Sequence, residues 1–278
     1  MAIKDSEIRK TVREGYASVA KQSRCGCSPT VSCCGAPASA EQISRAVGYS
    51  DEDMAAVPDG ANLGLGCGNP IALATLKPGE TVLDLGSGAG FDCFLAAKKV
   101  GDTGRVIGVD MTPEMLEKAR ENAAKVGAAN VEFRMGEIEH LPVADASVDA
   151  IISNCVINLS PDKPQVFREA FRALKRGGRL MVSDVVLTHE LPAAIRESVN
   201  LYVSCVSGAM LKADYLAAIR AAGFSDVKVV SENAFPMDLK YDDPVVDEVA
   251  KQAGLSEAEM RRLAEGVLSV KVSATRPA

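Results

Sequence analysis

The sequence contains only two histidines, His140 and His189, among its 278 residues. This scarcity disfavours a histidine-rich zinc site or a Cys–His nucleophile pair. The 31 basic residues are outnumbered by 37 acidic ones, and the net charge of −6 argues against a nucleic-acid partner. No apolar run reaches the roughly 18 residues that a membrane span needs. The N-terminal residues MAIKDSEIRK lack the apolar core of a signal peptide. We therefore expect a cytoplasmic protein with no membrane partner.

Eight cysteines stand out against this background. They are Cys25, Cys27, Cys33, Cys34, Cys67, Cys93, Cys155 and Cys205. In a small secreted domain such a number would indicate disulfides, whereas in a cytoplasmic chain of this size it indicates metal, metalloid or redox chemistry. Cys93 falls inside a predicted helix, so we expect it to be a core residue.

From about residue 78 the apolar pattern alternates between short strands and helices. Strands are predicted over 81–86, 105–110, 130–135, 148–154 and 178–185, and helices over 92–100, 112–127 and 164–175. This alternation predicts βαβ units and a parallel sheet covered on both faces. Further on, helices are predicted over 192–205 and 211–222, strands over 226–232 and 267–274, and a helical insertion over about 236–265.

The N-terminal part of the chain follows no such rhythm. Apolar residues at helical spacing predict a helix over 6–22. Residues 25–39 are rich in Gly, Ser and Pro and hold four cysteines, which predicts a mobile loop. Ser39 and Gln42 form a plausible capping box for a short helix that follows.

A glycine-rich turn, Asp84-Leu85-Gly86-Ser87-Gly88-Ala89-Gly90, joins the first predicted strand to its helix. Glycines let a ligand approach the backbone closely, and the helix N-terminus offers free N–H groups. The spacing differs from the dinucleotide motif G-x-G-x-x-G. Asp110 ends the second strand, where an acid can accept both hydroxyls of a ribose. The alternative, a turn that is glycine-rich only for tight packing, does not account for this acid.

At these residues the sequence resembles the class I S-adenosylmethionine methyltransferases. The resemblance implies an α/β, Rossmann-like fold, with a mostly parallel doubly wound sheet and an antiparallel last strand, plus a helical N-terminal segment and a C-terminal insertion. It also implies a cofactor site. Gly86, Gly88 and Gly90 would wall the methionine and ribose beside Asp84 and Ser87, Asp110 would bind the ribose, Met111 would pack on the adenine, Glu137 and Ile138 would lie at the adenine edge, and Asn154 would face the sulfonium.

Three cysteines lie where a methyl acceptor is expected. Cys155 follows the fourth strand, at the carboxyl end where open parallel sheets bind ligands. Cys67 lies in Gly-Cys-Gly-Asn-Pro just before the core, and Cys205 lies in Ser-Cys-Val-Ser-Gly-Ala after the fifth strand. Each taken alone could be a small buried apolar residue. The glycines around Cys67 and the polar residues around Cys155 favour a functional site.

With SNCVINLSPDK at 153–163, GLGCGNP at 64–70 and the Cys33-Cys34 pair, the chain resembles the arsenite methyltransferases. The resemblance implies that Cys67, Cys155 and Cys205 bind trivalent arsenic, assisted by Cys33 or Cys34. It also implies arsenite or its thiol conjugates as substrate, and an enzyme disulfide reduced by a thioredoxin- or glutathione-type system. Some members carry aromatic residues where this chain has residues 62–65.

This resemblance suggests a division of the chain into three parts. Residues 1–77 would form a helical, cysteine-rich segment, and 78–185 would form the cofactor-binding core. Residues 186–278 would bind arsenic and complete the sheet.

The expected chemistry agrees with these residue types. Trivalent arsenic is soft and prefers thiolates, and three thiolates leave its lone pair free to attack a methyl group. No proton leaves such a nucleophile, so no general base is needed. Two alternatives remain open: a methyltransferase for a small organic acceptor such as a quinone, and a non-catalytic thiol protein that sequesters zinc or arsenite. The glycine turn with Asp110 argues against the second, because a binder needs no cofactor.

Overall fold

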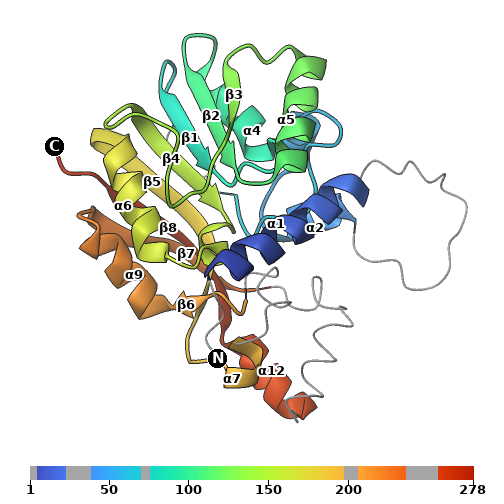
Figure 1. Ribbon diagram of the computed structural model, residues 1–278, viewed down its shortest axis with the longest axis vertical. Coiled ribbons are helices and arrows are strands. Elements are labelled where there is room, and N and C mark those ends of the chain that lie inside the picture. Colours follow the sequence, from blue (N-terminus) through green and yellow to red (C-terminus); the bar gives the residue numbers. More distant parts are fainter. Residues whose placement is uncertain (1–4, 23–38, 70–75, 197–205, 236–255) are drawn as a thin grey trace, which may run out of the picture.

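The computed structural model describes residues 5–22, 39–69, 76–196, 206–235 and 256–278 (Figure 1). The mobile loop predicted at 25–39 therefore lies almost wholly outside the described residues, as do Cys25, Cys27, Cys33, Cys34 and Cys205, most of the predicted helix 192–205 and most of the insertion 236–265. No described helix is both long and apolar enough to cross a bilayer.

The described part of the chain is built around one eight-stranded sheet. Its helices are α1 (Asp5–Gln22), α2 (Ala40–Ala46), α3 (Asp51–Ala55), α4 (Phe91–Val100), α5 (Pro113–Val126), the 3-10 turn η1 (Ile157–Leu159), α6 (Lys163–Ala173), α7 (Ala193–Arg196), α9 (Lys212–Ala221) and α12 (Glu257–Glu265). Its strands are β1 (Thr81–Leu85), β2 (Arg105–Asp110), β3 (Val131–Met135), β4 (Val148–Asn154), β5 (Leu174–Leu187), β6 (Met210–Leu211), β7 (Ser225–Ala234) and β8 (Val267–Thr275).

The strand order confirms the expected Rossmann-like fold. It runs β3-β2-β1-β4-β5-β8-β7, and the short β6 pairs with β5 outside this path. The pairs from β3 to β5 are all parallel. β8 runs antiparallel to both of its neighbours, β5 and β7. The last strand in the sequence is therefore inserted antiparallel within the sheet. The proposed boundary at residue 185 falls inside β5.

Helices cover both faces of the sheet because its central strands are apolar on both sides. On β1, Val82 packs in one cluster with α4 and α5, while Leu83 and Leu85 pack in another with α6 and α9. Figure 1 shows α6 and α9 together beside β5 and β8, and α4 and α5 beside β1 to β3. All three β1 side chains are fully buried.

The structure differs from the sequence prediction most clearly at β5 and α3. β5 begins at Leu174, inside the predicted helix 164–175 and well before the predicted strand start at 178. The strand accommodates Gly177 and Gly178 through an irregular register against β4, so a glycine pair that reads as a turn lies within a strand. The short helix α3 was not predicted; it is held by a capping box between Ser50 and Asp53. The capping box predicted at Ser39 and Gln42 is confirmed.

A third apolar cluster lies at the carboxyl ends of the strands. It joins α1 to Cys67 and Cys155 and to residues at the end of β5 and the start of β8. α1 contacts α5 and η1, and so lies across this end of the sheet (Figure 1). Ion pairs link α1 to the core, from Arg9 to Glu137 and the buried Glu139 and from Lys21 to Glu114.

Candidate active site

A pocket opens between α1, the residue 61–66 segment and the carboxyl ends of β1, β2 and β4. Its empty volume, with the open mouth included, is about 1060 Å³. Of the predicted cofactor residues, Asp84, Gly86, Ser87, Gly88, Asp110, Met111, Ile138 and Asn154 line it. Gly90 and Glu137 are described but do not line it.

The glycine turn leaves room beside the pocket at one position in particular. Gly88 has a φ of +51°, and a Cβ built on it would meet nothing within 4 Å. Gly90 has another role. Its φ is +94°, it precedes α4, and a Cβ there would lie 2.8 Å from the rings of Phe94 and Phe133. Gly88 thus keeps the pocket wall open to a ligand, while Gly90 lets α4 pack on the sheet.

Asp110 connects this turn to the start of α5. One carboxylate oxygen accepts from the Gly88 N–H at 2.9 Å, and the other accepts from the Thr112 N–H at 2.8 Å. Burial raises the pKa of Asp110, and these backbone hydrogen bonds oppose the rise. The carboxylate also lines the pocket, where it is placed to accept hydrogen bonds from a diol. The open cradle at Gly88 and this acceptor pair fit a nucleoside ligand.

Glu139 was not predicted, yet it lines the pocket where Glu137 does not. Its carboxylate accepts from the Ser160 hydroxyl at 2.7 Å and from Arg9 at 3.3 Å. Glu137 lies outside the pocket and pairs with the same Arg9 at 3.4 Å. The two acids therefore fix α1 over the site. Glu137 and Glu139 are identical side chains two residues apart, so the sequence offered little basis for choosing which of them lines the pocket.

An acidic wall lies opposite, at Asp84 and Asp92. Burial raises the pKa of Asp92 to about 6, although hydrogen bonds from Tyr49 and Asn154 oppose the rise. Burial, followed by the charge of Asp92, raises the pKa of Asp84 well above its ordinary range. The buried thiol of Cys93 donates to Asp84 at 3.2 Å. A raised pKa favours the neutral acid, so Asp92, whose pKa of about 6 lies below neutral pH, is the member of this pair that can present negative charge to a cationic ligand.

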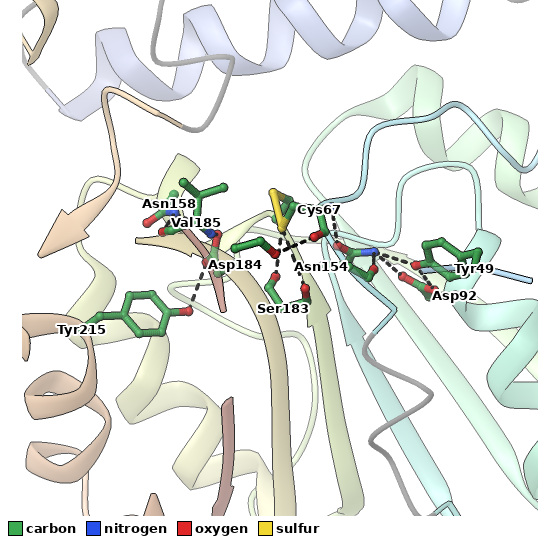
Figure 2. Close-up of a disulfide and its surroundings, with 12 residues drawn as sticks. Tyr49, Cys67, Asp92, Asn154, Asn158, Ser183, Asp184, Val185 and Tyr215 are labelled. Carbon is green, nitrogen blue, oxygen red and sulfur yellow. Dashed lines mark hydrogen bonds between the residues drawn. A yellow bond between two sulfur atoms is a disulfide. The ribbon is translucent and has the colours of Figure 1, made fainter. Parts of the chain in front are cut away.

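Asn154 connects Asp92 of the acidic wall to Cys67 (Figure 2). Its amide nitrogen donates to the Tyr49 hydroxyl at 2.7 Å, to Asp92 at 3.1 Å and to the Gly68 carbonyl at 2.7 Å. Its amide oxygen accepts from the Cys67 N–H at 2.9 Å. The Tyr49 hydroxyl in turn donates to Asp92 at 2.7 Å. Asn154 therefore holds the Cys67 segment against β4 as well as lining the pocket.

Cys67 and Cys155 form a disulfide, with their Cα atoms 5.6 Å apart. Both residues are buried, and Cys155 lines the pocket. The carbonyl of Ser183 on β5 accepts from the Cys155 N–H at 2.8 Å and lies 3.5 Å from the Cys67 sulfur. Cys155 has a φ of +58°, a left-handed conformation that non-glycine residues seldom adopt. Such strain is characteristic of functional positions.

A buried acid, Asp184 on β5, lies beside this pair. Its carboxylate and the two sulfur atoms all lie within 4.8 Å of one another. Figure 2 shows Asp184 between the sulfurs and Tyr215 of α9. Nothing in the sequence marks Asp184 as a site residue, because a single acid in the apolar run of a strand resembles an ordinary sheet residue. The structure thus brings together two of the three predicted arsenic ligands and adds an unexpected carboxylate.

Comparisons with known proteins agree with this geometry. A family model described as "Methyltransferase domain" matches residues 76–249. The arsenite methyltransferase of Halobacterium salinarum is 53% identical, over 82% of this chain and 60% of that protein. The human arsenite methyltransferase is 36% identical, over 86% of this chain and 64% of that protein. The chain therefore spans about 60% of the length of the curated relatives it matches.

Among solved structures, the chain is similar to CrArsM, an arsenic(III) S-adenosylmethionine methyltransferase from Chlamydomonas reinhardtii. The TM-score is 0.61 and the identity 32%, and the match covers 88% of this chain and 75% of that one. With its sheet order and its cysteine pair at the carboxyl end, this chain belongs to the arsenic(III) S-adenosylmethionine methyltransferase family.

Proposed function

We propose that this protein transfers methyl groups from S-adenosylmethionine to trivalent arsenic held by cysteine thiolates, which gives methylated arsenicals and detoxifies arsenic. One observation carries the proposal. Cys155, in a strained conformation and linked to Cys67, lines the same pocket as Gly88 and Asp110. A soft-metalloid site and a nucleoside cradle therefore share one cavity, which neither an organic-acceptor enzyme nor a pure thiol binder requires.

The pocket residues suggest how the cofactor is held. Asp110 would accept hydrogen bonds from the ribose, with Asp84, Gly86, Ser87 and Gly88 beside the methionine end. Met111 and Ile138 would line the part of the pocket that holds the adenine. Gly90 and Glu137 would support the site from outside the pocket, and Asn154 would form part of its wall. When bound, the cofactor supplies an electrophilic methyl group on a sulfonium, whose positive charge Asp92 would stabilise.

Arsenic binding would require the Cys67–Cys155 disulfide to be reduced. The two thiolates, joined by Cys205, would then hold the arsenic with its lone pair uncommitted. Cys205 lies outside the described residues, as do Cys33 and Cys34, one of which would assist the transfer. No side chain needs to remove a proton from the nucleophile, and the chain's task is to position it.

The redox chemistry points to a partner and a compartment. An enzyme that works with reduced thiols and forms a disulfide needs a thiol reductant of the thioredoxin or glutathione type. Such reductants keep cytoplasmic thiols reduced, so we place the protein in the cytoplasm. We also retain the division into an N-terminal segment, a cofactor-binding core and an arsenic-binding C-terminal region.

The test compares Cys155→Ser with Cys93→Ser, each incubated with arsenite, S-adenosylmethionine and a thiol. Serine swaps a soft ligand for a hard hydroxyl, so Cys155→Ser should abolish methylation while calorimetry still detects cofactor binding. Cys93 lies away from the disulfide, and serine keeps its hydrogen bond to Asp84, so that variant should remain active. Methylated arsenicals are measured by chromatography with mass spectrometry. Substantial turnover by Cys155→Ser would contradict the proposal and revive the organic-acceptor alternative.

A further inference from the structure

Asp184 is an acid in a position where an ionised carboxylate is hard to stabilise. Its residue is fully buried on β5, in the middle of the sheet. Nevertheless, its carboxylate lies within 4.8 Å of the sulfurs of Cys67 and Cys155. One water molecule can span such a separation between a carboxylate and a thiol. The acid is thus within relay distance of two sulfur atoms that change their protonation whenever their bond is made or broken.

The groups around Asp184 hold its carboxylate in a fixed place. One oxygen accepts from the Asn158 amide at 2.8 Å and from the Val185 N–H at 2.9 Å, and the other accepts from the Tyr215 hydroxyl at 3.1 Å. Asn158 is itself buried and anchored to the Val185 carbonyl. Lys163 of α6 adds a distant positive charge. The carboxylate can therefore neither rotate into solvent nor withdraw from the sulfurs.

The two cysteines differ in their relation to the pocket. Both are buried, at 2% exposure for Cys67 and 4% for Cys155, but Cys155 lines the pocket and Cys67 does not. A thiol entering through the pocket reaches the Cys155 sulfur first. Attack there makes Cys67 the leaving group, and its thiolate is released in a buried site where negative charge is costly.

We propose that Asp184 is the proton donor to Cys67 when the Cys67–Cys155 disulfide is reduced, and the proton acceptor when it re-forms. This deepens the proposed function, on which its biological purpose rests, but the step itself needs neither arsenic nor cofactor. Burial raises the pKa of Asp184 to about 7, with the Val185 and Tyr215 hydrogen bonds opposing the rise. Both protonation states are then populated at neutral pH, as a two-way relay requires.

The step balances with a dithiol as the reductant. A thiolate of the dithiol attacks the Cys155 sulfur, a mixed disulfide forms, the Cys67–Cys155 bond breaks, and the Cys67 thiolate takes the proton of Asp184. The second thiol of the dithiol, after losing its proton to solvent, attacks the mixed disulfide and releases Cys155 as a thiolate, which Asp184 protonates after regaining a proton from solvent. The dithiol loses two electrons and becomes a cyclic disulfide, and the enzyme gains two electrons and two protons.

The test measures how fast dithiothreitol reduces the oxidised full-length chain between pH 5.5 and 8.5, without arsenic or cofactor. Acid quenching, alkylation and mass spectrometry of the Cys67 and Cys155 peptides isolate this disulfide from the other cysteines. In the native chain the rate should rise about tenfold per pH unit up to about pH 7 and then level off, because reductant thiolate accumulates as protonated Asp184 is lost. Asp184→Asn should be about 100-fold slower at pH 6 and rise without levelling.

Asparagine has nearly the size of aspartate and keeps an acceptor for Asn158 and Val185, so the variant should fold; the urea midpoint of the oxidised protein checks this. Tyr215→Phe is the matched control. It keeps the carboxylate but removes a hydrogen bond that favours the charged form, so the bend should move to higher pH with an unchanged rate at pH 6.

Equal rates for the native chain and Asp184→Asn at pH 6 would overturn the proposal. Any difference at high pH would then reflect repulsion between ionised Asp184 and the incoming thiolate. The proposal would also be overturned if the rate–pH profile of Asp184→Asn kept its bend and that of Tyr215→Phe bent at the native pH. The bend would then belong to another titrating group. Since no methylation is measured, failure here leaves the proposed function intact, and loss of methylation in Cys155→Ser leaves this proposal intact.

Discussion

Asp110 shows how one residue can shape a site and also face its ligand. Its two oxygens hold the Gly88 and Thr112 amides, which fixes the glycine turn relative to the start of α5. The same carboxylate lines the pocket. Removing it should therefore affect both the proposed contact with the ribose and the shape of the turn, and two variants are needed to separate the effects.

We expect Asp110→Ala to weaken S-adenosylmethionine binding by about 10- to 100-fold. The lost charge-assisted hydrogen bonds contribute roughly 1.5–3 kcal/mol, at about 1.4 kcal/mol per decade of affinity. Asp110→Asn keeps one acceptor oxygen and should lose less. Calorimetry with the cofactor measures both, and arsenite binding should be nearly unchanged. Equal affinity in all three proteins would remove Asp110 from the cofactor site.

The sequence was informative about the site where position along a strand determines position in space. Gly88 and Asp110 lie in the pocket because both follow the carboxyl ends of parallel strands. Tyr49 and Asp184 could not be found in this way. Tyr49 and Asn154 are hydrogen-bonded although 105 residues separate them in the sequence. Asp184 is of interest because it lies near a disulfide whose two cysteines come from other segments. Long-range contacts of this kind leave no local pattern.

Among the elements, α1 has the most direct effect on the pocket. Arg9 lines it and pairs with Glu139, whose side chain is only 4% exposed. Lys10 lies next to Arg9 but is 67% exposed and pairs with Glu14 on the surface. The two neighbouring cations of one helix therefore separate an effect on the pocket from a general loss of charge.

Arg9→Ala should weaken cofactor binding by about tenfold, mainly through faster dissociation. The change leaves Glu139 buried without its cationic partner and loosens α1 over the pocket, at a cost of about 1.4 kcal/mol. Lys10→Ala should leave affinity and off-rate unchanged, because exposed pairs contribute little. Stopped-flow displacement of the bound cofactor gives the off-rates. An identical response of the two variants would show that α1 does not close the site.

Element prediction worked best for the buried strands and worst where glycine lies within one. β1, β2 and β4 match their predicted ranges to within a residue because short apolar runs with turn residues on both sides are distinctive. β5 starts four residues early because its glycine pair is absorbed into an irregular strand. Pairing with β4 and β8 overrides the local preference for a turn.

On the scale of the whole molecule, the buried acids link stability to pH. Burial raises the pKa of Asp184 from its ordinary value of 3.8 to about 7 and that of Asp92 to about 6. A raised folded-state pKa favours the protonated form. The stabilisation is therefore complete below about pH 4, falls as the pH rises toward 7, and changes no further above that.

Asp184→Asn should remove the share of this pH dependence that belongs to Asp184. Three pKa units correspond to about 4 kcal/mol, so the native chain should lose up to that amount of stability between pH 4 and 8 relative to the variant. Urea unfolding of the oxidised proteins at several pH values measures the difference. Parallel pH curves for the two proteins would show that Asp184 has an ordinary pKa in the folded state.

The Cys67–Cys155 bond also has a consequence for how long the protein lasts. It closes a loop of 88 residues that contains all of β1 to β4. Such a closure lowers the conformational entropy of the unfolded chain and so raises the free energy of unfolding by about 4–5 kcal/mol. The oxidised protein is then the more durable one, and the reduced protein, which the proposed function requires, is more exposed to proteolysis. On the proposed function, abundant reductant would raise turnover and shorten the lifetime of each molecule. Oxidising stress would instead keep the protein in an inactive form that resists proteolysis.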